Sequence, residues 1–131
     1  MDLVAIGFST LLEPAVLMML VAGLFAGLIV GSIPGINDNI AFAVFIPFSF
    51  AMPAAEALAL MVGVYCAAAS GGAIPAIMIK VPGTASALLT AVDGNAMARK
   101  DQAGKALSIA ITSSVVGGAI CSLVLLLFAP M

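Results

Sequence analysis

The strongest constraint on this chain is a run of uncharged, mostly apolar residues near its start. Residues 15–33 read AVLMMLVAGLFAGLIVGSI and contain no Asp, Glu, Lys or Arg. At a rise of 1.5 Å per residue, an α-helix of this length measures ~28 Å, close to the thickness of the hydrocarbon core of a bilayer. The run therefore predicts a transmembrane helix, and Pro14, which suits the first turn of a helix, precedes it.

Composition extends this prediction to the whole chain. Of its 131 residues, 64% are hydrophobic and 8% are charged, whereas soluble domains have about 45–50% apolar and ~25% charged residues. The net charge of -2 argues against a nucleic-acid partner, which would require a basic face. The chain has no histidine, so a Ser-His dyad and a histidine metal site are excluded. We expect a protein of the lipid bilayer with no catalytic residues, no metal site and no cofactor.

Further apolar segments predict an all-α fold, a polytopic transmembrane helical bundle. Residues 1–131 form a single transmembrane region, and two of its expected helices are too short to cross the bilayer core alone. These two helices, 40–52 and 84–92, each follow a Pro-Gly dipeptide, which predicts broken or re-entrant helices. The expected helices lie at about 15–33, 40–52, 54–69, 84–92 and 105–129.

Glycines recur at every fourth position of the first predicted span, at Gly23, Gly27 and Gly31. On an α-helix this spacing places them on one face, where the absence of side chains lets a second helix approach closely. The series predicts a helix-packing face. A surface on which the two helices slide is the alternative interpretation.

The two Pro-Gly dipeptides lie in similar surroundings. The first Pro-Gly segment (residues 33–39) reads IPGINDN, and the second Pro-Gly segment (residues 80–86) reads KVPGTAS. If both lie at membrane depth, the helices that follow point their free N–H groups at a wet cavity, which favours an anion such as a carboxylate. Surface turns between ordinary spans are the alternative. The candidate substrate-binding residues are Pro34, Gly35, Asn37, Asn39, Pro82, Gly83, Thr84 and Ser86.

Asp38 introduces a negative charge into the first Pro-Gly segment. An ionisable residue inside a membrane is costly and usually functional. Because a carboxylate repels an anionic substrate, Asp38 is a candidate ligand for a coupling cation, Na⁺ or H⁺. A solvated loop aspartate is the other interpretation. Asp93, in the sequence AVDGN, is expected to end a helix in a turn near the cytoplasmic face.

Basic residues indicate an orientation. Arg99, Lys100 and Lys105 cluster between the predicted short helix and the last span, and no basic residue precedes Lys80. The positive-inside rule places this cluster in the cytoplasm.

Several stretches resemble a known family. They are GLIVGSIPG, a helix that contains FIPFSF, and GVYCAAASGGAIPAIMIKVPGTASALLTAVDGNAMARKDQAGKALSIA. Together they are similar to the N-terminal part of the large membrane subunit (TctA) of tripartite tricarboxylate transporters. The resemblance covers residues 23–118 and is most specific from Gly71 to Gly94 and over residues 103–107.

The resemblance implies a secondary transporter for carboxylates in the bacterial inner membrane, driven by a cation gradient. It implies two partners, a small membrane subunit and a periplasmic solute-binding protein, and it implies that both Pro-Gly segments line the substrate site. Family members are several times longer, so the chain corresponds to their N-terminal part. The family usually carries small residues at the positions of Asn37, Asp38 and Asn39, and this departure leaves the substrate specificity open. A structural or assembly subunit without transport activity is the alternative function.

Overall fold

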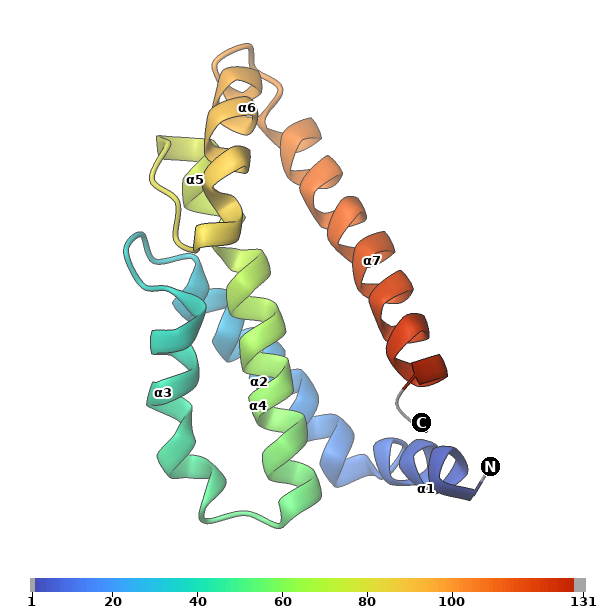
Figure 1. Ribbon diagram of the computed structural model, residues 1–131. Helices are drawn as coiled ribbons and strands as arrows, with labels where there is room; N and C mark the ends of the chain where they lie inside the picture. Colours follow the sequence, from blue (N-terminus) through green and yellow to red (C-terminus); the bar gives the residue numbers. More distant parts are fainter. Residues whose placement is uncertain (1, 129–131) are drawn as a thin grey trace.

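The described part of the chain is helical throughout. The computed structural model describes residues 2–128, and the described elements are seven α-helices and one 3₁₀ helix. Figure 1 shows them arranged as an elongated bundle. In chain order the elements are α1 (Asp2–Leu11), α2 (Pro14–Gly31), α3 (Asp38–Ser49), α4 (Ala54–Gly71), α5 (Ala73–Ile79), η1 (Ala85–Ala87), α6 (Leu88–Ala98) and α7 (Ala103–Phe128).

Three stretches are long and apolar enough to cross a membrane: Pro14–Gly31, Ala54–Ile79 and Ala103–Phe128. The second stretch combines α4 and α5, which are separated only by Gly72. Helix α3 is apolar but shorter, with 12 residues, or ~18 Å at the rise of an α-helix. The all-α, polytopic helical bundle that the sequence predicted is confirmed.

Helices α2 and α4 form the tightest pair. A Cβ atom added to Gly23, Gly27 or Gly31 would strike the backbone of Leu60, Val64 or Ala68, respectively. Both series rise by four residues in the same direction, so the two helices run parallel.

Small residues of α4 return the contact, because a Cβ on Gly63 would lie 2.6 Å from the Leu20 carbonyl oxygen. The glycine series therefore lies buried against α4, a predicted helix that the sequence analysis did not identify as its partner.

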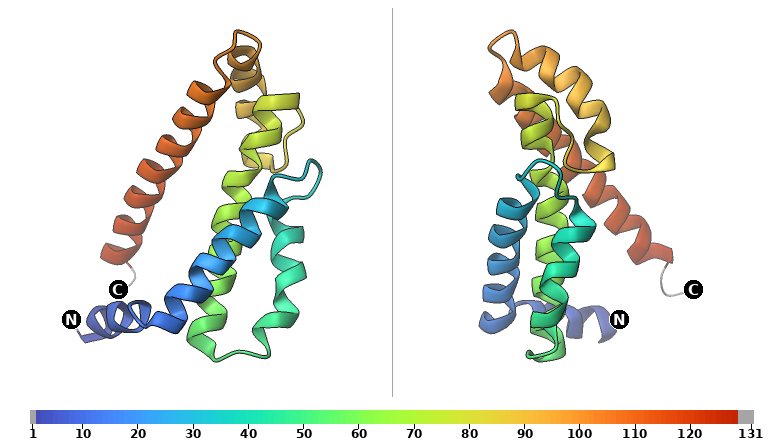
Figure 2. Two further views of the ribbon diagram at one scale, coloured as in Figure 1. Left: turned by 180° about the vertical axis from the view of Figure 1, so that it is seen from behind. Right: turned by 90° about the vertical axis from the view of Figure 1, so that its left-hand side faces the viewer.

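Helix α3 runs in the opposite direction and covers one side of this pair (Figures 1 and 2). Ala41 of α3 is fully buried in a cluster with Val64 and Ala68 of α4. Phe42 and Tyr65 add an edge-to-face aromatic contact, with ring centroids 6.0 Å apart. The start of α3 is thereby held beside the last turns of α2 and α4.

Helices α5 and α6 pack side by side beyond the end of α4 and run in the same direction (Figure 1). Ala76 packs with Ala87 and Ala91 in a small buried cluster. The Asn95 side-chain amide, 7% exposed, donates a 3.0 Å hydrogen bond to the carbonyl oxygen of Ile77 in the last turn of α5. This bond satisfies one of the free carbonyl groups that every helix end leaves. The α5–α6 pair is therefore fixed by packing and by a buried polar contact.

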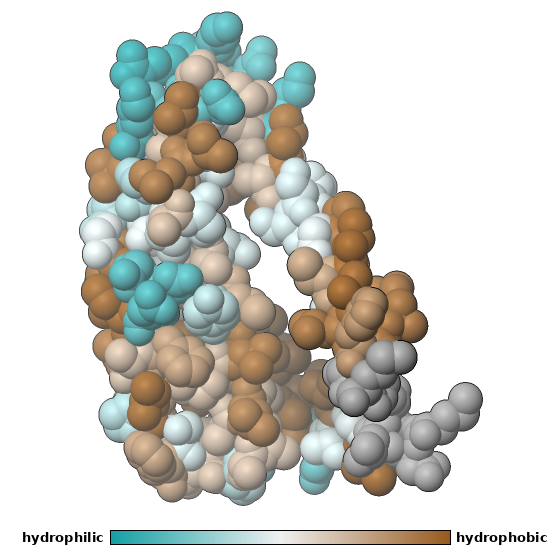
Figure 3. Space-filling view, viewed as in Figure 1, coloured by the Kyte–Doolittle hydropathy of each residue, from teal (hydrophilic) through white to brown (hydrophobic). Residues whose placement is uncertain are grey.

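Helix α7 leaves the bundle at an angle (Figure 2). The turn before it is a hydrophilic end of the molecule (Figure 3) and carries Arg99 and Lys100. Ala106 is the buried residue of α7 within the described range, and the rest of its length is largely exposed.

The helices differ from the sequence prediction by a few residues at most of their ends, and three differences are informative. Helix α3 begins at Asp38 rather than at residue 40, because Asn37 caps it. Residues 73–79 form a helix, α5, which was not expected, because Gly72 keeps a right-handed helical conformation and Pro75 lies in the first turn, where its missing N–H costs little. Helix α6 continues to Ala98 instead of ending near residue 92.

Candidate functional site between two Pro-Gly segments

The first Pro-Gly segment contains a tight turn between α2 and α3. The Ile36 N–H donates a 3.2 Å hydrogen bond to the Ile33 carbonyl oxygen, and Gly35 has a φ of 91°. A proline at the second position and a positive φ at the third are the marks of a type II turn, which favours glycine there. Pro34 and Gly35 are both exposed. The chain reverses here in a defined conformation.

The three polar residues after this turn have different surroundings. Asn37 is the N-cap of α3, and its side-chain oxygen accepts a 2.9 Å hydrogen bond from the Ile40 N–H. Asp38 is the first residue of α3 and is half-buried, whereas Asn39 is exposed. A carboxylate in the first turn is stabilised by the positive end of the helix dipole. Asn37 thus has a structural role, and Asp38 remains partly accessible at the helix start.

The second Pro-Gly segment lies against the end of the α2–α4 pair. A Cβ on Gly83 would lie 3.1 Å from the Gly72 Cα atom and 3.3 Å from the Gly31 carbonyl oxygen. Such a contact requires the neighbouring backbone to shift, so three glycines meet here at backbone distance. Pro82, before them, is half-buried.

Thr84 follows in the interior. Its side chain is 3% exposed and lies near Gly72, where a Cβ would be 3.0 Å from the Thr84 methyl group. The Thr84 and Ser86 hydroxyl oxygens are 2.9 Å apart and share a hydrogen bond. Ser86 itself is exposed. The pair links a buried residue of the segment to an accessible one in η1.

The two Pro-Gly segments lie at the same level of the bundle. Figures 1 and 2 show α3 running away from this level in one direction and η1 with α6 running away in the other. The helix N-termini therefore face each other. Among residues 2–128, no hydrogen bond joins residues 33–39 to residues 80–86. Packing against the ends of α2 and α4 brings the two segments together.

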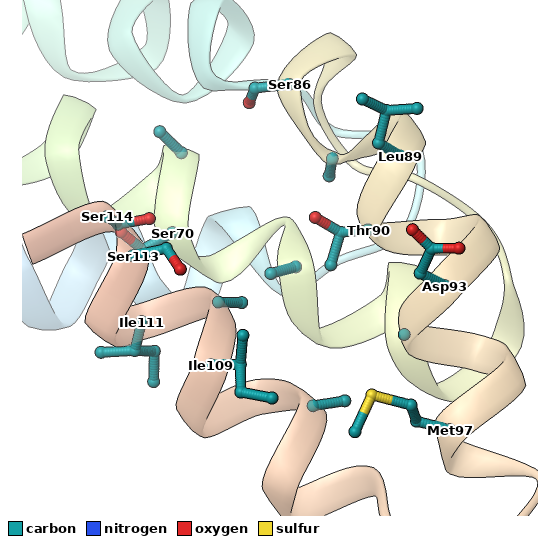
Figure 4. Close-up of a pocket in the computed structure, with 16 residues that line it drawn as sticks. Ser70, Ser86, Leu89, Thr90, Asp93, Met97, Ile109, Ile111, Ser113 and Ser114 are labelled. Carbon is teal, nitrogen blue, oxygen red and sulfur yellow. The ribbon is translucent and has the colours of Figure 1, made fainter. Parts of the chain in front are cut away.

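A cavity of about 390 Å³ lies beside this level, between α4, α6 and α7. Figure 4 shows Thr90 and Asp93 on one side of it and Ser70, Ser113 and Ser114 on the other. We name it the α6–α7 cavity. Its lining residues are Ala69, Ser70, Ala73, Ser86, Ala87, Leu89, Thr90, Asp93, Gly94, Met97, Ala106, Ile109, Ala110, Ile111, Ser113 and Ser114.

The cavity contains polar residues that the sequence analysis did not select. The prediction for Asp93 is wrong, because Asp93 lies inside α6 rather than in a turn that ends a helix. The Asp-Gly dipeptide favours a turn locally, but Gly94 packs on Ile77, where a Cβ would lie 2.8 Å from a side-chain carbon. Thr90 and Asp93 stand three residues apart on one face of α6. This three-residue spacing is the feature of the sequence from which the two polar residues could have been selected as a pair.

A hydrophilic patch also lies over the start of α3 (Figure 3). It is separated from the hydrophilic end at the α6–α7 turn by largely apolar surface. A polar patch part-way along an apolar bundle is the arrangement expected of a site at membrane depth.

Comparison with known proteins connects this arrangement to a transport family. Residues 17–131 match the model of the tripartite tricarboxylate transporter TctA family. The chain belongs to this family. A relative from Agrobacterium vitis, an uncharacterized 52.8 kDa protein in the TAR-I ttuC' 3' region, is 37% identical over 133 residues. This match covers 99% of the chain and 26% of the relative, so the chain spans about a quarter of the relative's length. No solved structure matches.

Family membership has direct consequences for the class of protein. TctA proteins are membrane subunits of tripartite transporters and are not enzymes. The three apolar helices of this chain agree with a membrane protein of that family. The resemblance inferred from the sequence motifs is confirmed.

Proposed function

We propose that this chain forms the N-terminal part of the large membrane subunit of a cation-coupled carboxylate transporter in the bacterial inner membrane. In this proposal a periplasmic solute-binding protein delivers a tricarboxylate or dicarboxylate, and a small membrane subunit completes the complex. The two Pro-Gly segments then line the substrate site.

The observation that carries this proposal is the meeting of the two Pro-Gly segments at the end of the α2–α4 pair. The first N–H groups of a helix have no partner within the helix, and here these are the N–H groups of Asp38 and Asn39 in α3 and of Ala85 and Ser86 in η1. The next N–H groups are bonded, since the Ile40 N–H donates to the Asn37 side chain and the Ala87 N–H donates to the Thr84 carbonyl oxygen. The first N–H groups, together with the positive ends of the helix dipoles, attract anions. Facing helix starts within a membrane bundle form the substrate sites of many secondary transporters.

Asp38 divides the site into two parts of different charge preference. Its carboxylate already occupies the positive end of α3, so a substrate anion is repelled there and a Na⁺ ion or a proton is attracted. The start of η1 carries no acidic residue and remains favourable to a carboxylate. A charge at membrane depth costs about 2.5–3.5 kcal/mol on insertion scales, and a bound cation offsets this cost.

The proposal includes an orientation in the membrane, in which the basic α6–α7 turn is cytoplasmic. Arg99 and Lys100 lie at the α6–α7 turn, and α7 runs from there toward the end that carries α1 and the α3–α4 connection (Figure 1). By the positive-inside rule, the latter end faces the periplasm. The Pro-Gly segments then lie between the two membrane faces.

The test is a substitution of Asp38 in the assembled transporter, with uptake of a radiolabelled carboxylate measured in membrane vesicles. Asp38→Asn keeps the size of the side chain and removes its charge. We expect at least a tenfold rise, about 1.4 kcal/mol, in the cation concentration that gives half-maximal uptake.

Glu56→Gln is the matched control, because Glu56 also lies in the first turn of a helix, α4, but at the opposite end of the bundle from Asp38. It should leave the cation dependence unchanged. Uptake by Asp38→Asn with the original cation dependence would show that Asp38 has no coupling role.

A further inference from the structure

Apart from Ser86, the polar lining of the α6–α7 cavity has no role in the transport proposal. Within it, Ser86, Thr90, Asp93 and Met97 follow one another at spacings of four, three and four residues, which places them on one face of η1 and α6. Ser113 and Ser114 of α7 and Ser70 of α4 face them across the space (Figure 4). Oxygen atoms from three helices therefore line one open, water-accessible groove, and the Asp93 side chain is itself exposed.

We propose that the α6–α7 cavity is a hydrated binding site for a monovalent inorganic cation, with Asp93 as its charged ligand. Carboxylate and hydroxyl oxygens are ligands for hard cations. Asp93 is the charged residue among the lining residues that the structure describes, and no lysine or arginine is among them. The field within the cavity therefore attracts cations and repels anions.

The size of the cavity determines the state of the bound ion. About 390 Å³ is far more than the ~15 Å³ that one water molecule requires. Six polar side chains line this space, and each of them can hold water. The ion therefore keeps part of its hydration shell, and Asp93 is its anchor rather than one member of a closed coordination cage.

The hydroxyl groups are suited to act as acceptors. Ser70 donates its own hydrogen to the Cys66 carbonyl oxygen at 3.0 Å, as serines in helices commonly do. Its oxygen lone pairs consequently remain available to a cation or to its waters. Ser86 is the last residue of the second Pro-Gly segment and is hydrogen-bonded to Thr84 of the same segment. The cation site thus borders the candidate substrate site, and the two share Ser86.

This inference does not rest on the transport proposal, because the site requires only the cavity and its charge. It is tested without uptake, by the accessibility of a cysteine in the cavity. A failure here leaves the roles of Asp38 and of the Pro-Gly segments unaffected.

The experiment places a reporter cysteine at Ser114 of the chain in its natural membrane assembly, with Cys66 and Cys121 changed to alanine. The probes are two water-soluble methanethiosulfonate reagents of similar size, one with a trimethylammonium group and one with a sulfonate group. We expect Ser114→Cys to react with both, and to favour the cationic reagent by about threefold or more, relative to free thiol, because of the nearby Asp93 charge.

Two variants test whether the preference for the cationic reagent comes from Asp93. Asp93→Asn should remove it, and addition of sodium chloride, compared with choline chloride at equal ionic strength, should slow the cationic reagent only when Asp93 is present. Asp101→Asn is the control, because Asp101 lies in the α6–α7 turn outside the cavity and has a φ of 57°, which asparagine tolerates. It should leave both effects unchanged.

Three kinds of result would contradict the proposed cation site. A reporter that reacts with neither reagent would show a cavity without water, and a second reporter at Thr90 would check that this result does not come from a misfolded variant. Equal reaction rates of the two reagents, or a preference that persists in Asp93→Asn, would overturn the assignment of Asp93. A sodium effect no larger than the choline effect would overturn the ion site.

Discussion

The α2–α4 pair and the α6–α7 pair belong to the same bundle, yet they use glycine in opposite ways. In the first pair, a Cβ on Gly27 would strike the backbone of Val64. In the second pair, Gly117 and Gly118 have no atom within 4 Å of an added Cβ. The first pair leaves no space between its helices, whereas the second borders an open cavity of about 390 Å³.

The α2–α4 pair therefore acts as a rigid frame, whereas the side of the bundle next to α7 is open. Close approach of two backbones depends on every glycine in the series, so the α2–α4 pair can change only if both helices move together. The first Pro-Gly segment joins α2 to α3, whose Ala41 is buried against α4, and Gly83 of the second segment packs on Gly31 and Gly72 at the end of this pair. The frame therefore fixes the candidate site, and the space beside α7 is where water and ions can enter.

Among the variants that test this comparison, Gly27→Leu is expected to lower the free energy of unfolding the most. The new side chain has no room against Val64, so the helices must separate, and we expect a loss of at least ~3 kcal/mol in the free energy of unfolding. Unfolding in detergent micelles by titration with sodium dodecyl sulfate measures it.

Gly117→Leu makes the same chemical change on α7 and is the matched control. Because nothing lies near Gly117, we expect a change within about 0.5 kcal/mol. Similar losses in both variants would mean that the glycine series of α2 has no special packing role.

A smaller loss in the free energy of unfolding is expected from Asn95→Ala, which tests the contact between α5 and α6. The Asn95 side chain binds the Ile77 carbonyl oxygen, and its own oxygen accepts a 3.1 Å hydrogen bond from Arg99. Its removal leaves a buried carbonyl group without a partner, at a cost of about 1–2 kcal/mol in the free energy of unfolding.

Asn39→Ala is the comparison for this loss, because Asn39 is an exposed amide in the first turn of α3. We expect it to change the same free energy by less than about 0.5 kcal/mol. If Asn95→Ala changes the free energy of unfolding as little as Asn39→Ala does, the bond to Ile77 does not hold α5 and α6 together.

The sequence predicted the membrane helices because their signal is local. Residues 15–33 carry no charge over the length of a bilayer core, and this property alone indicates a span. The resemblance to the TctA family likewise came from short motifs. The N-cap of α3 was also readable, since Asn37 precedes an apolar helix in the manner of a capping residue, and its omission displaced the expected start of α3.

Other features depend on contacts between distant residues. Asp93 and Gly94 form a turn dipeptide in the sequence, but packing of Gly94 on Ile77 and the bond from Asn95 keep α6 helical beyond them. The partner of the glycine series could not be identified, because several helices offer small residues. The α6–α7 cavity was equally hidden, since Ser113 and Thr90 come together only through the angle between α6 and α7.

The central claim is that both Pro-Gly segments line one carboxylate site. The most direct measurement is substrate protection of two single cysteines, Asn39→Cys and Ser86→Cys, in the assembled transporter. Both residues are exposed, one at the start of α3 and one in η1. Gly104→Cys, at an exposed position in the first turn of α7 with no atom within 4 Å of an added Cβ, is the control. A water-soluble thiol reagent is applied with and without a saturating carboxylate substrate. Our account predicts that the substrate slows the labelling of both site cysteines and leaves the control unchanged; protection of only one of them, or of neither, would contradict it.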